Sequence, residues 1–291
     1  MKIETLVNLI SGELLNSPYI SEVVSYTDNA EEVRRGSCFF SFGGDINKAV
    51  KNGAYAIISD KYERVTDKEI AWIKVDDLKS AIFDIVKYEN MTTTVKFTDE
   101  ITLDIIEKMN QSHEVIILKT LNDLLRGLNF PGAVLVTSRE EFKNLFFSVE
   151  RVKEKKIDLI QLTLFLSKFE NTQINLPYVY KKNFSKALNF FIKEGLKYTL
   201  DFTLERFKPI FVDSEFRQVP YGSSEKVLIT GIKSDEYFFD ELNYFIQNTK
   251  HAKSVVINKK NRKLLKEGFN FALIVDTEIK LGEEELQKGL F

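Results

Sequence analysis

Along the chain, apolar runs of strand length alternate with segments whose apolar residues recur at helical spacing. The stretch from Tyr26 to Asp60 shows the change between strand and helix patterns best. Ser37 to Phe42 is an apolar run of strand length, and Gly43-Gly44-Asp45 ends it. Asp45 can cap a short helix that follows, and Gly53 suits the position just after a helix end. A second apolar run completes the pattern. The stretch therefore predicts a β-loop-α-β unit with a glycine pair between strand and helix.

The same periods continue on both sides of this unit and predict a compact α/β domain over residues 1–90. Its other expected elements are a helix over 6–14, strands over 21–26 and 70–75, and a helix that Asp76 or Asp77 caps. The polar residues 90–94 are the expected linker to the next domain.

Strands and helices alternate regularly over the next 55 or so residues, which is typical of β-α-β units. The expected order is a strand over 95–98, a helix capped by Asp99, a strand over 115–118, a helix over 121–128, a strand over 133–137, and a helix to about Val149 that starts with a capping box of Ser138 and Glu141. This pattern favours a mostly parallel sheet covered by helices.

After about residue 150 the chain departs from this alternation of strands and helices, and from about residue 226 it returns to it. It predicts a hairpin of strand-like segments 159–169 and 174–179, an amphipathic helix over 183–192 that ends at Gly195, strands over 226–230, 254–258 and 271–276, and helices over 235–247 and 260–266. The predicted fold class is therefore α/β with three modules, over residues 1–90, 91–216 and 217–291.

Composition narrows the class of protein. The 41 basic and 43 acidic residues give a net charge of −2, so no overall field favours nucleic acid or an anionic membrane. The single cysteine, Cys38, excludes an intramolecular disulfide, and its place in an apolar run indicates a buried thiol rather than a nucleophile. The first residues do not have the pattern of a signal peptide, and no apolar run is long enough to span a bilayer. We expect a soluble cytoplasmic protein.

Two glycine-containing turns are candidates for holding an anion. The phosphate-loop pattern G-x-x-x-x-G-K-S/T is absent, and the nearest imitation is Thr230-Gly231-Ile232-Lys233-Ser234, between an expected strand and helix. Backbone N–H groups at such a turn can receive an anion, so Gly231, Lys233 and Ser234 are candidates, although a plain turn between strand and helix is the default interpretation. Gly43-Gly44-Asp45, between a strand end and a helix start, is the better candidate by position, although tight-turn geometry alone explains most such glycine pairs.

The sequence predicts no catalytic residue, no metal ligand set and no cofactor. His113 and His251 each precede an expected strand and lack ligands at zinc-binding spacing. His113 beside Glu114 could act as an acid/base pair, against the simpler interpretation of loop residues. The pairs Asp235-Glu236 and Asp240-Glu241 are expected to be solvated on a surface helix.

The opening stretch resembles the N-terminal domain of the Mur ligases, especially the types that add the third residue or the D-Ala-D-Ala dipeptide to UDP-muramoyl peptides. The resemblance lies in Val33-Arg34-Arg35-Gly36, Phe39-Phe40, Gly43-Gly44-Asp45 and the segment Ala49 to Ala54. Looser likeness extends over 176–196 and 207–217. It implies three domains in the family's order, the last one Rossmann-like. It also implies substrate contacts at Asp28, Asn29, Gly43, Gly44, Asp45 and Asn183.

The departures from that family concern its ligands. Asn29-Ala30-Glu31 stands where the family has aspartate-serine-arginine, and Lys182 stands where a histidine is expected. The ATP-binding loop should fall near 92–100, where Thr92 to Glu100 offers no phosphate cradle. About 110 to 120 residues are left for the central domain, much fewer than the family uses. Acyl-phosphate formation therefore has no evident machinery.

Three hypotheses follow from the sequence. The first is a catalytically silent Mur-ligase-like protein of peptidoglycan precursor metabolism, which binds a UDP-muramoyl peptide or acts as a partner of another cell-wall enzyme. The second is an enzyme with unrelated chemistry that uses His113 or His251. The third is an interaction module whose clefts are filled by side chains such as the 24 Phe.

Overall fold

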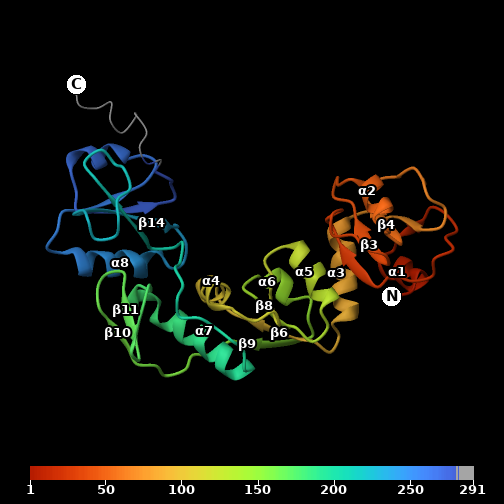
Figure 1. Cartoon of the computed structure of the whole chain (residues 1–291), viewed down its shortest axis with the longest axis horizontal. Coiled ribbons are helices and arrows are strands. Elements are labelled where there is room, and N and C mark those ends of the chain that lie inside the picture. Colours follow the sequence, from red (N-terminus) through yellow and green to blue (C-terminus); the bar gives the residue numbers. More distant parts are fainter. Residues whose placement is uncertain (280, 282–291) are drawn as a thin grey trace. The chain divides into compact units, whose positions relative to one another are not determined.

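The computed structural model describes residues 1–279 and 281, and it has four β-sheets with helices packed on them (Figure 1). The chain forms two compact units. The first unit contains residues 1–103 and 112–152, and the second contains residues 104–111 and those from 153 onward. The α/β fold class is confirmed, whereas the three-domain boundaries stay a prediction.

The first sheet of the first unit has the strand order β1-β5-β4-β3-β2. All neighbours are parallel except β1, which is antiparallel to β5. Its elements are α1 (Ile3–Leu9), β1 (Glu13–Leu14), β2 (Ser25–Thr27), β3 (Ser37–Phe40), α2 (Ile46–Lys51), β4 (Ala56–Ser59), β5 (Ala71–Lys74) and α3 (Leu78–Glu89). The predicted β-loop-α-β unit is thus β3, α2 and β4.

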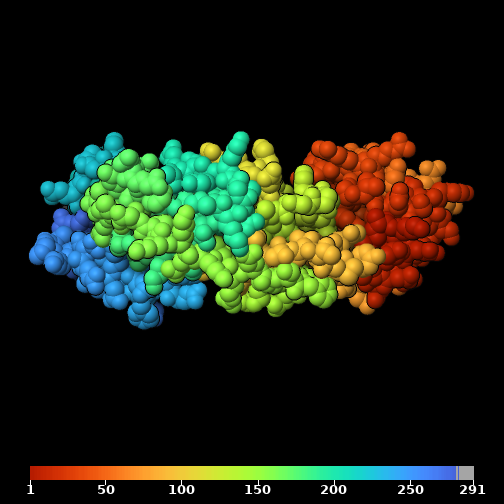
Figure 2. All heavy atoms as spheres, turned by 90° about the horizontal axis from the view of Figure 1, so that it is seen from below, coloured from red at the N-terminus to blue at the C-terminus, as the bar shows by residue number. Residues whose placement is uncertain are grey.

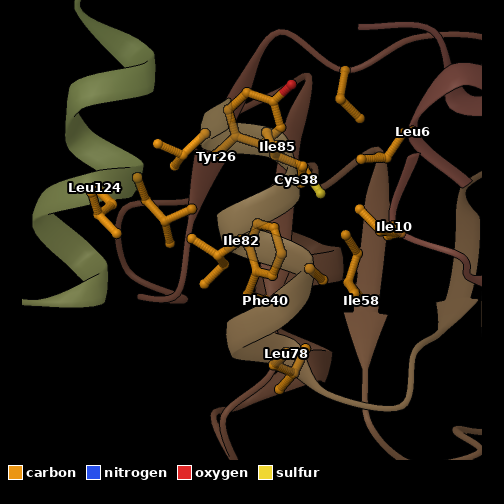
Figure 3. Close-up of a cluster of buried hydrophobic side chains, with 14 of the residues drawn as sticks. Leu6, Ile10, Tyr26, Cys38, Phe40, Ile58, Leu78, Ile82, Ile85 and Leu124 are labelled. Carbon is orange, nitrogen blue, oxygen red and sulfur yellow. The ribbon is translucent and has the colours of Figure 1, made fainter. Parts of the chain in front are cut away.

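Both faces of this sheet are covered. On one face, apolar residues of α3 such as Ile82 and Ile85 pack with Phe40 and Ile58, and Leu124 of a further helix joins the cluster (Figure 3). On the other face, α2 packs against a second cluster that contains Phe39, Ile57 and Trp72. Strands buried on both faces read as continuous apolar runs, which is why the sequence shows them so clearly.

Local capping and burial in this domain agree with the sequence. The Asp45 carboxylate accepts a hydrogen bond from the Lys48 N–H at 3.0 Å, and Asp77 caps α3 in the same way at 2.7 Å. Gly53 follows the end of α2 with φ +96°. Cys38 is fully buried, and burial raises the pKa of its thiol well above the ordinary range. The prediction of a buried thiol is confirmed.

The second sheet of the first unit is entirely parallel, with the order β7-β8-β6-β9. Its elements are β6 (Thr94–Phe97), β7 (Val115–Ile117), α5 (Leu121–Asn129), β8 (Val134–Thr137), α6 (Glu140–Lys143) and β9 (Ser148–Arg151). Helix α4 (Glu100–Met109) begins after β6 in the first unit, and its residues from 104 onward belong to the second unit. The predicted parallel sheet is confirmed.

Two predictions in this segment are wrong. Helix α6 ends at Lys143, and the residues expected to continue it form β9, which pairs with β6 from Thr94 to Phe97. The capping box does not form at Ser138 either: the N-cap of α6 is Arg139, no side chain caps the helix, and the Glu141 carboxylate pairs with Lys79. The box occurs at α5, between Thr120 and Asp123.

The second unit contains a small antiparallel sheet and a mixed four-stranded sheet of order β13-β14-β16-β15. Its elements are β10 (Leu159–Gln161), β11 (Ser167–Phe169), β12 (Thr172–Ile174), the 3₁₀ helix η1 (Tyr178–Tyr180), α7 (Lys181–Glu194), β13 (Lys208–Val212), β14 (Lys226–Ile232), α8 (Phe238–Thr249), β15 (Ser254–Ile257), the 3₁₀ helix η2 (Arg262–Glu267) and β16 (Phe271–Val275).

Helix α8 links these two sheets. Its Asn248 side chain accepts a hydrogen bond from Gln161 of the small sheet at 2.7 Å, and its Tyr244 hydroxyl accepts one from the Tyr178 N–H at 3.3 Å. In Figure 2 green atoms of the small sheet accordingly lie next to blue atoms of the last segment. The expected strand over 174–179 is wrong in its second half, where η1 forms. In the part of the chain that the structure describes, no helix is both long and apolar enough to cross a membrane.

Candidate functional site

The parallel pairing of β2 and β3 gathers five of the predicted substrate-binding residues at one edge of the first sheet. Asp28 and Asn29 directly follow β2, and Gly43-Gly44-Asp45 follows β3, so both groups extend from the carboxyl ends of adjacent strands. A Cβ added to Gly44 would lie 4.0 Å from the Asp28 carbonyl oxygen and 3.2 Å from Phe39 Cζ. We call these five residues the N-terminal edge. The sixth, Asn183, lies half-buried on α7 in the second unit.

The glycine loop of the N-terminal edge is open to solvent. Gly43 is exposed, has φ +87°, and a Cβ added to it would meet nothing within 4 Å. The polar side chains around it are occupied by local structure. Asp45 caps α2, and Asn29 accepts a hydrogen bond from the Glu31 N–H at 3.0 Å while donating to Glu32 at 3.3 Å. The edge therefore offers space and backbone groups more than unused side chains.

The electrostatics of the N-terminal edge are acidic. Burial is the main reason that the pKa of the Asp28 carboxyl is raised above its ordinary value; a backbone hydrogen bond opposes this, and the carboxylates of Glu32 and Asp123 add smaller upward effects. Lys48 is ion-paired with Glu31. A diphosphate placed beside Asp28 would meet several negative charges at close range, which opposes its binding.

The junction between β6 and α4 lies where the sequence places the ATP-binding loop of the resembled family. The Thr98 N–H donates to the Thr137 carbonyl oxygen at 3.0 Å, and α4 begins only two residues later. The Asp99 carboxylate accepts hydrogen bonds from the Thr102 N–H and hydroxyl, both at 2.8 Å. A carboxylate of the chain itself thus sits at the helix N-terminus, where a bound phosphate would otherwise be stabilised.

The anion candidate at Thr230 to Ser234 is built differently from its prediction. Gly231 lies inside β14, at an irregularity in its pairing with β16, and α8 starts only at Phe238. A Cβ on Gly231 would lie 2.0 Å from the Glu205 carbonyl oxygen, so this glycine allows close backbone packing. The Ser234 N–H donates to the Asp276 carboxylate at 3.1 Å. Lys233 is exposed nearby.

A buried charge cluster in the second unit was not predicted. The Arg206 guanidinium donates to both Asp235 oxygens at 2.5 and 2.7 Å, and to both Glu241 oxygens at 2.5 and 2.9 Å. The Tyr180 hydroxyl also donates to Glu241, whose side chain is 0% exposed. Burial alone would lower the pKa of Arg206, but these carboxylates raise it above its ordinary value. We call these four residues the Arg206 cluster.

The expectation that the pairs Asp235-Glu236 and Asp240-Glu241 are solvated on a surface helix is therefore wrong for Asp235, which precedes α8 and is bound by Arg206, and for Glu241. Its helical position gave a signal that the sequence analysis missed, because Glu241 lies one turn before Tyr244 and Phe245 on the buried face of α8. No short-range pattern, however, could have identified Arg206 as its partner, 35 residues earlier in the chain.

The two histidines lie in turns just before β7 and β15, as predicted, and both are exposed. Among the residues that the structure describes, no group of three or more His, Cys, Asp and Glu side chains could hold a metal ion.

Comparison with known proteins gives matches only at the level of solved structures. No family model and no curated protein matches the sequence. MurF from Acinetobacter baumannii is similar at 10% identity and a TM-score of 0.49, over 88% of this chain and 78% of that one. The UDP-N-acetylmuramoylalanyl-D-glutamyl-2,6-diaminopimelate--D-alanyl-D-alanyl ligase from the same organism is similar at 8% identity and a TM-score of 0.48, over 94% of both chains.

A third similar structure is MurF ligase from Thermotoga maritima in complex with ADP, at 12% identity and a TM-score of 0.47, over 80% of this chain and 77% of that one. These are Mur ligases, the family that the sequence resembles. Because the identities and scores are low, the proposals that follow depend on the residues of this chain.

Proposed function

We propose that this protein is a catalytically silent Mur-ligase-like protein that serves peptidoglycan precursor metabolism as a partner of an active ligase. The observation that carries the proposal is the β6–α4 junction. Acyl-phosphate formation needs backbone N–H groups around the phosphates, a lysine and a magnesium ion. Here the helix start is closed by Asp99, whose carboxylate holds the Thr102 N–H at 2.8 Å. A triphosphate would have to displace this carboxylate and overcome its charge.

The acidic N-terminal edge favours a protein partner over a nucleotide-sugar ligand. Asp28 lies near Glu32 and Asp123, which weakens the attraction for a diphosphate. The adjoining Phe42 is 48% exposed and lies two residues after the end of β3, so the edge combines an apolar side chain with surrounding acids. Such a combination suits a basic protein surface with an apolar centre.

Binding of a UDP-muramoyl peptide is the second candidate, and the open space beside Gly43 favours it. A ligand could approach the backbone there without displacing a side chain. This binding would require contacts strong enough to offset the acidic surroundings of Asp28.

Catalysis and ligand binding are tested together by calorimetric titration of the full chain with UDP-muramoyl peptides, with and without ATP, and by an assay of ADP release. We expect no ADP release under any combination of substrates. Measurable turnover would overturn the proposal of a silent protein. Saturable heat from the UDP-muramoyl peptide alone would favour the second candidate over the first.

The partner role is tested by measuring the affinity of the chain for purified Mur ligases from the same cytosol. Phe42→Glu should weaken binding at least about tenfold, because it places a charge in the apolar centre of the contact. Tyr19→Glu is the matched control, since Tyr19 is 88% exposed and its backbone pairs with Glu69 beyond β5, away from β2 and β3. Equal loss in both variants, or no binding by the unaltered chain, would contradict the partner role.

A further inference from the structure

A pocket of about 180 Å³ lies in the second unit, apart from every residue used in the proposed function. The turn between β10 and β11 supplies Phe165, the chain after β12 supplies Asn175, and the segment from Thr203 to Pro209 forms a further wall. An apolar cavity of about 150 Å³ is known to take up benzene. The volume of this pocket is therefore that of a single ring with a small substituent.

The pocket has an apolar floor and a polar rim. Phe165, Leu204 and Phe207 are 6%, 4% and 1% exposed, so they form its buried part. Asn175 and Thr203 are exposed at its mouth, where an amide and a hydroxyl can donate and accept hydrogen bonds. Ligand sites commonly combine an apolar lining with a few polar groups in this way.

The charged residues that line the pocket are already paired within the protein. Arg206 is held by the carboxylates of Asp235 and Glu241, and Lys208 donates to Glu205 at 3.0 Å. A bound anion would have to compete with these carboxylates, and a bound cation would lie against Arg206 itself. Since burying a charge without a partner is costly, the lining favours an uncharged ligand.

The wall formed by Thr203 to Pro209 is rigidly built around a strained residue. Phe207 has φ +54°, which a side chain of this size rarely adopts. Its ring is fixed by Tyr244 at a centroid distance of 5.6 Å and by Phe165 at 6.3 Å. The four hydrogen bonds of Arg206 and the close packing of Gly231 on the Glu205 carbonyl hold the backbone on either side. Such strain persists where the surrounding structure imposes it, and it concentrates at binding and catalytic sites.

From these observations we infer that the pocket binds an uncharged, ring-sized ligand, with the ring on Phe165, Leu204 and Phe207 and a polar edge toward Asn175 and Thr203. The wall is formed before the ligand arrives, so binding orders few groups. The inference goes beyond the proposed function. Because the two concern different units of the chain, either can fail while the other holds.

Saturation-transfer NMR and chemical-shift titration of the full chain with phenol, benzoate and benzylammonium test this inference. The three probes share a ring and differ in charge. We expect phenol to bind at least about tenfold more tightly than either charged probe, because only phenol enters without losing the solvation of a charge. Equal affinity for all three, tighter binding of a charged probe, or no binding of phenol would overturn the inference.

Thr203→Trp places an indole in the mouth of the pocket and should abolish phenol binding. Thr172→Trp is the matched control, because Thr172 is an exposed threonine on β12 that does not line the pocket. Far-UV circular dichroism and the thermal midpoint check that both variants are folded. Phenol binding that persists in Thr203→Trp, or that is lost equally in Thr172→Trp, would place the probe elsewhere and refute the assignment.

Discussion

Gly43 lies in the loop after β3 and Gly231 lies near the end of β14; both are exposed and have similar positive φ angles of +87° and +80°. Their surroundings are nevertheless opposite. A Cβ on Gly43 would point into open space, whereas one on Gly231 would lie 2.0 Å from the Glu205 carbonyl oxygen. The first glycine leaves a loop free at the N-terminal edge, and the second lets the chain before β13 approach β14. The exposure and the φ angle of a glycine alone therefore do not show whether open space or packed backbone lies beside it.

The acidic residues near these two glycines, Asp28 and Asp235, also differ in their surroundings. Asp28 lies among other acids, and burial together with their charges raises the pKa of its carboxyl. Burial is the largest single influence on the pKa of Asp235 and acts upward, but hydrogen bonds from Arg206 and the Tyr237 N–H, together with the charges of Arg206 and Lys233, lower the pKa of this carboxyl overall. The difference teaches that a distant cation, rather than the local sequence, decides whether an acid after a strand stabilises the fold.

The largest expected difference in stability is between the alanine variants of the two glycines. Gly231→Ala should lower the free energy of unfolding by about 4 kcal/mol, because the methyl group meets backbone atoms that cannot move aside and the left-handed conformation is strained. Gly43→Ala should cost only about 1 kcal/mol, since only the conformational strain applies. Urea unfolding at pH 7 measures both values.

Equal costs for the two alanine variants would mean that the Gly231 turn relaxes and that the packed arrangement is not rigid. Gly132→Ala is a further reference for strain alone, because Gly132 has φ +91° and open space around it. Its cost should match that of Gly43→Ala within about 0.5 kcal/mol.

Short-range chemistry made much of the fold predictable. The caps at Asp45, Asp77 and Asp99 each depend on a backbone N–H three residues later, so local sequence is sufficient. The strands that are buried on both faces were also predictable, because each is a continuous apolar run in the sequence. The strand β9 was mistaken for a helix because its stabilisation comes from pairing with β6, 54 residues earlier in the chain.

The candidate sites were predictable only where adjacent strands carry them. Asp28 and Gly44 meet because β2 and β3 are parallel neighbours, which an α/β pattern suggests. The Arg206 cluster and the pocket beside it depend on a segment without regular structure between α7 and β13. Its side chains meet α8 through long-range contacts that no periodicity in the sequence records.

The next effect in size concerns Asp235. Asp235→Asn should lower the free energy of unfolding by about 2 kcal/mol at pH 7, because it removes charge-assisted hydrogen bonds from Arg206. The folded-state pKa of this carboxyl is lowered, so its contribution is complete above the unfolded value of about 4 and is lost as the pH falls through the folded value. The difference between the variant and the unaltered chain should therefore shrink below about pH 4.

Urea unfolding at several pH values between 3 and 7 checks this prediction, with Asp240→Asn as the control. Asp240 is exposed in the first turn of α8, shortly after Asp235, and its replacement should change the stability by no more than about 0.5 kcal/mol. A pH-independent loss in Asp235→Asn would show that the lowered pKa does not contribute to folding.

Replacement of Asp28 should have the smallest effect on stability, and it should raise the free energy of unfolding rather than lower it. Its folded-state pKa is raised, so the folded chain binds this proton more tightly than the unfolded chain, and stability is lost as the pH rises through the folded value. At pH 7 the ionised carboxylate therefore weakens folding, and Asp28→Asn should be more stable by up to about 0.5 kcal/mol, a small gain because solvent screens this half-buried group. The gain should vanish below the unfolded value of about 4. Unfolding curves for Asp28→Asn and for the exposed control Asp60→Asn measure this gain. A loss of stability in Asp28→Asn at pH 7 would mean that Asp28 has a favourable partner in the folded chain. The N-terminal edge would then repel anions less than its acidic residues indicate.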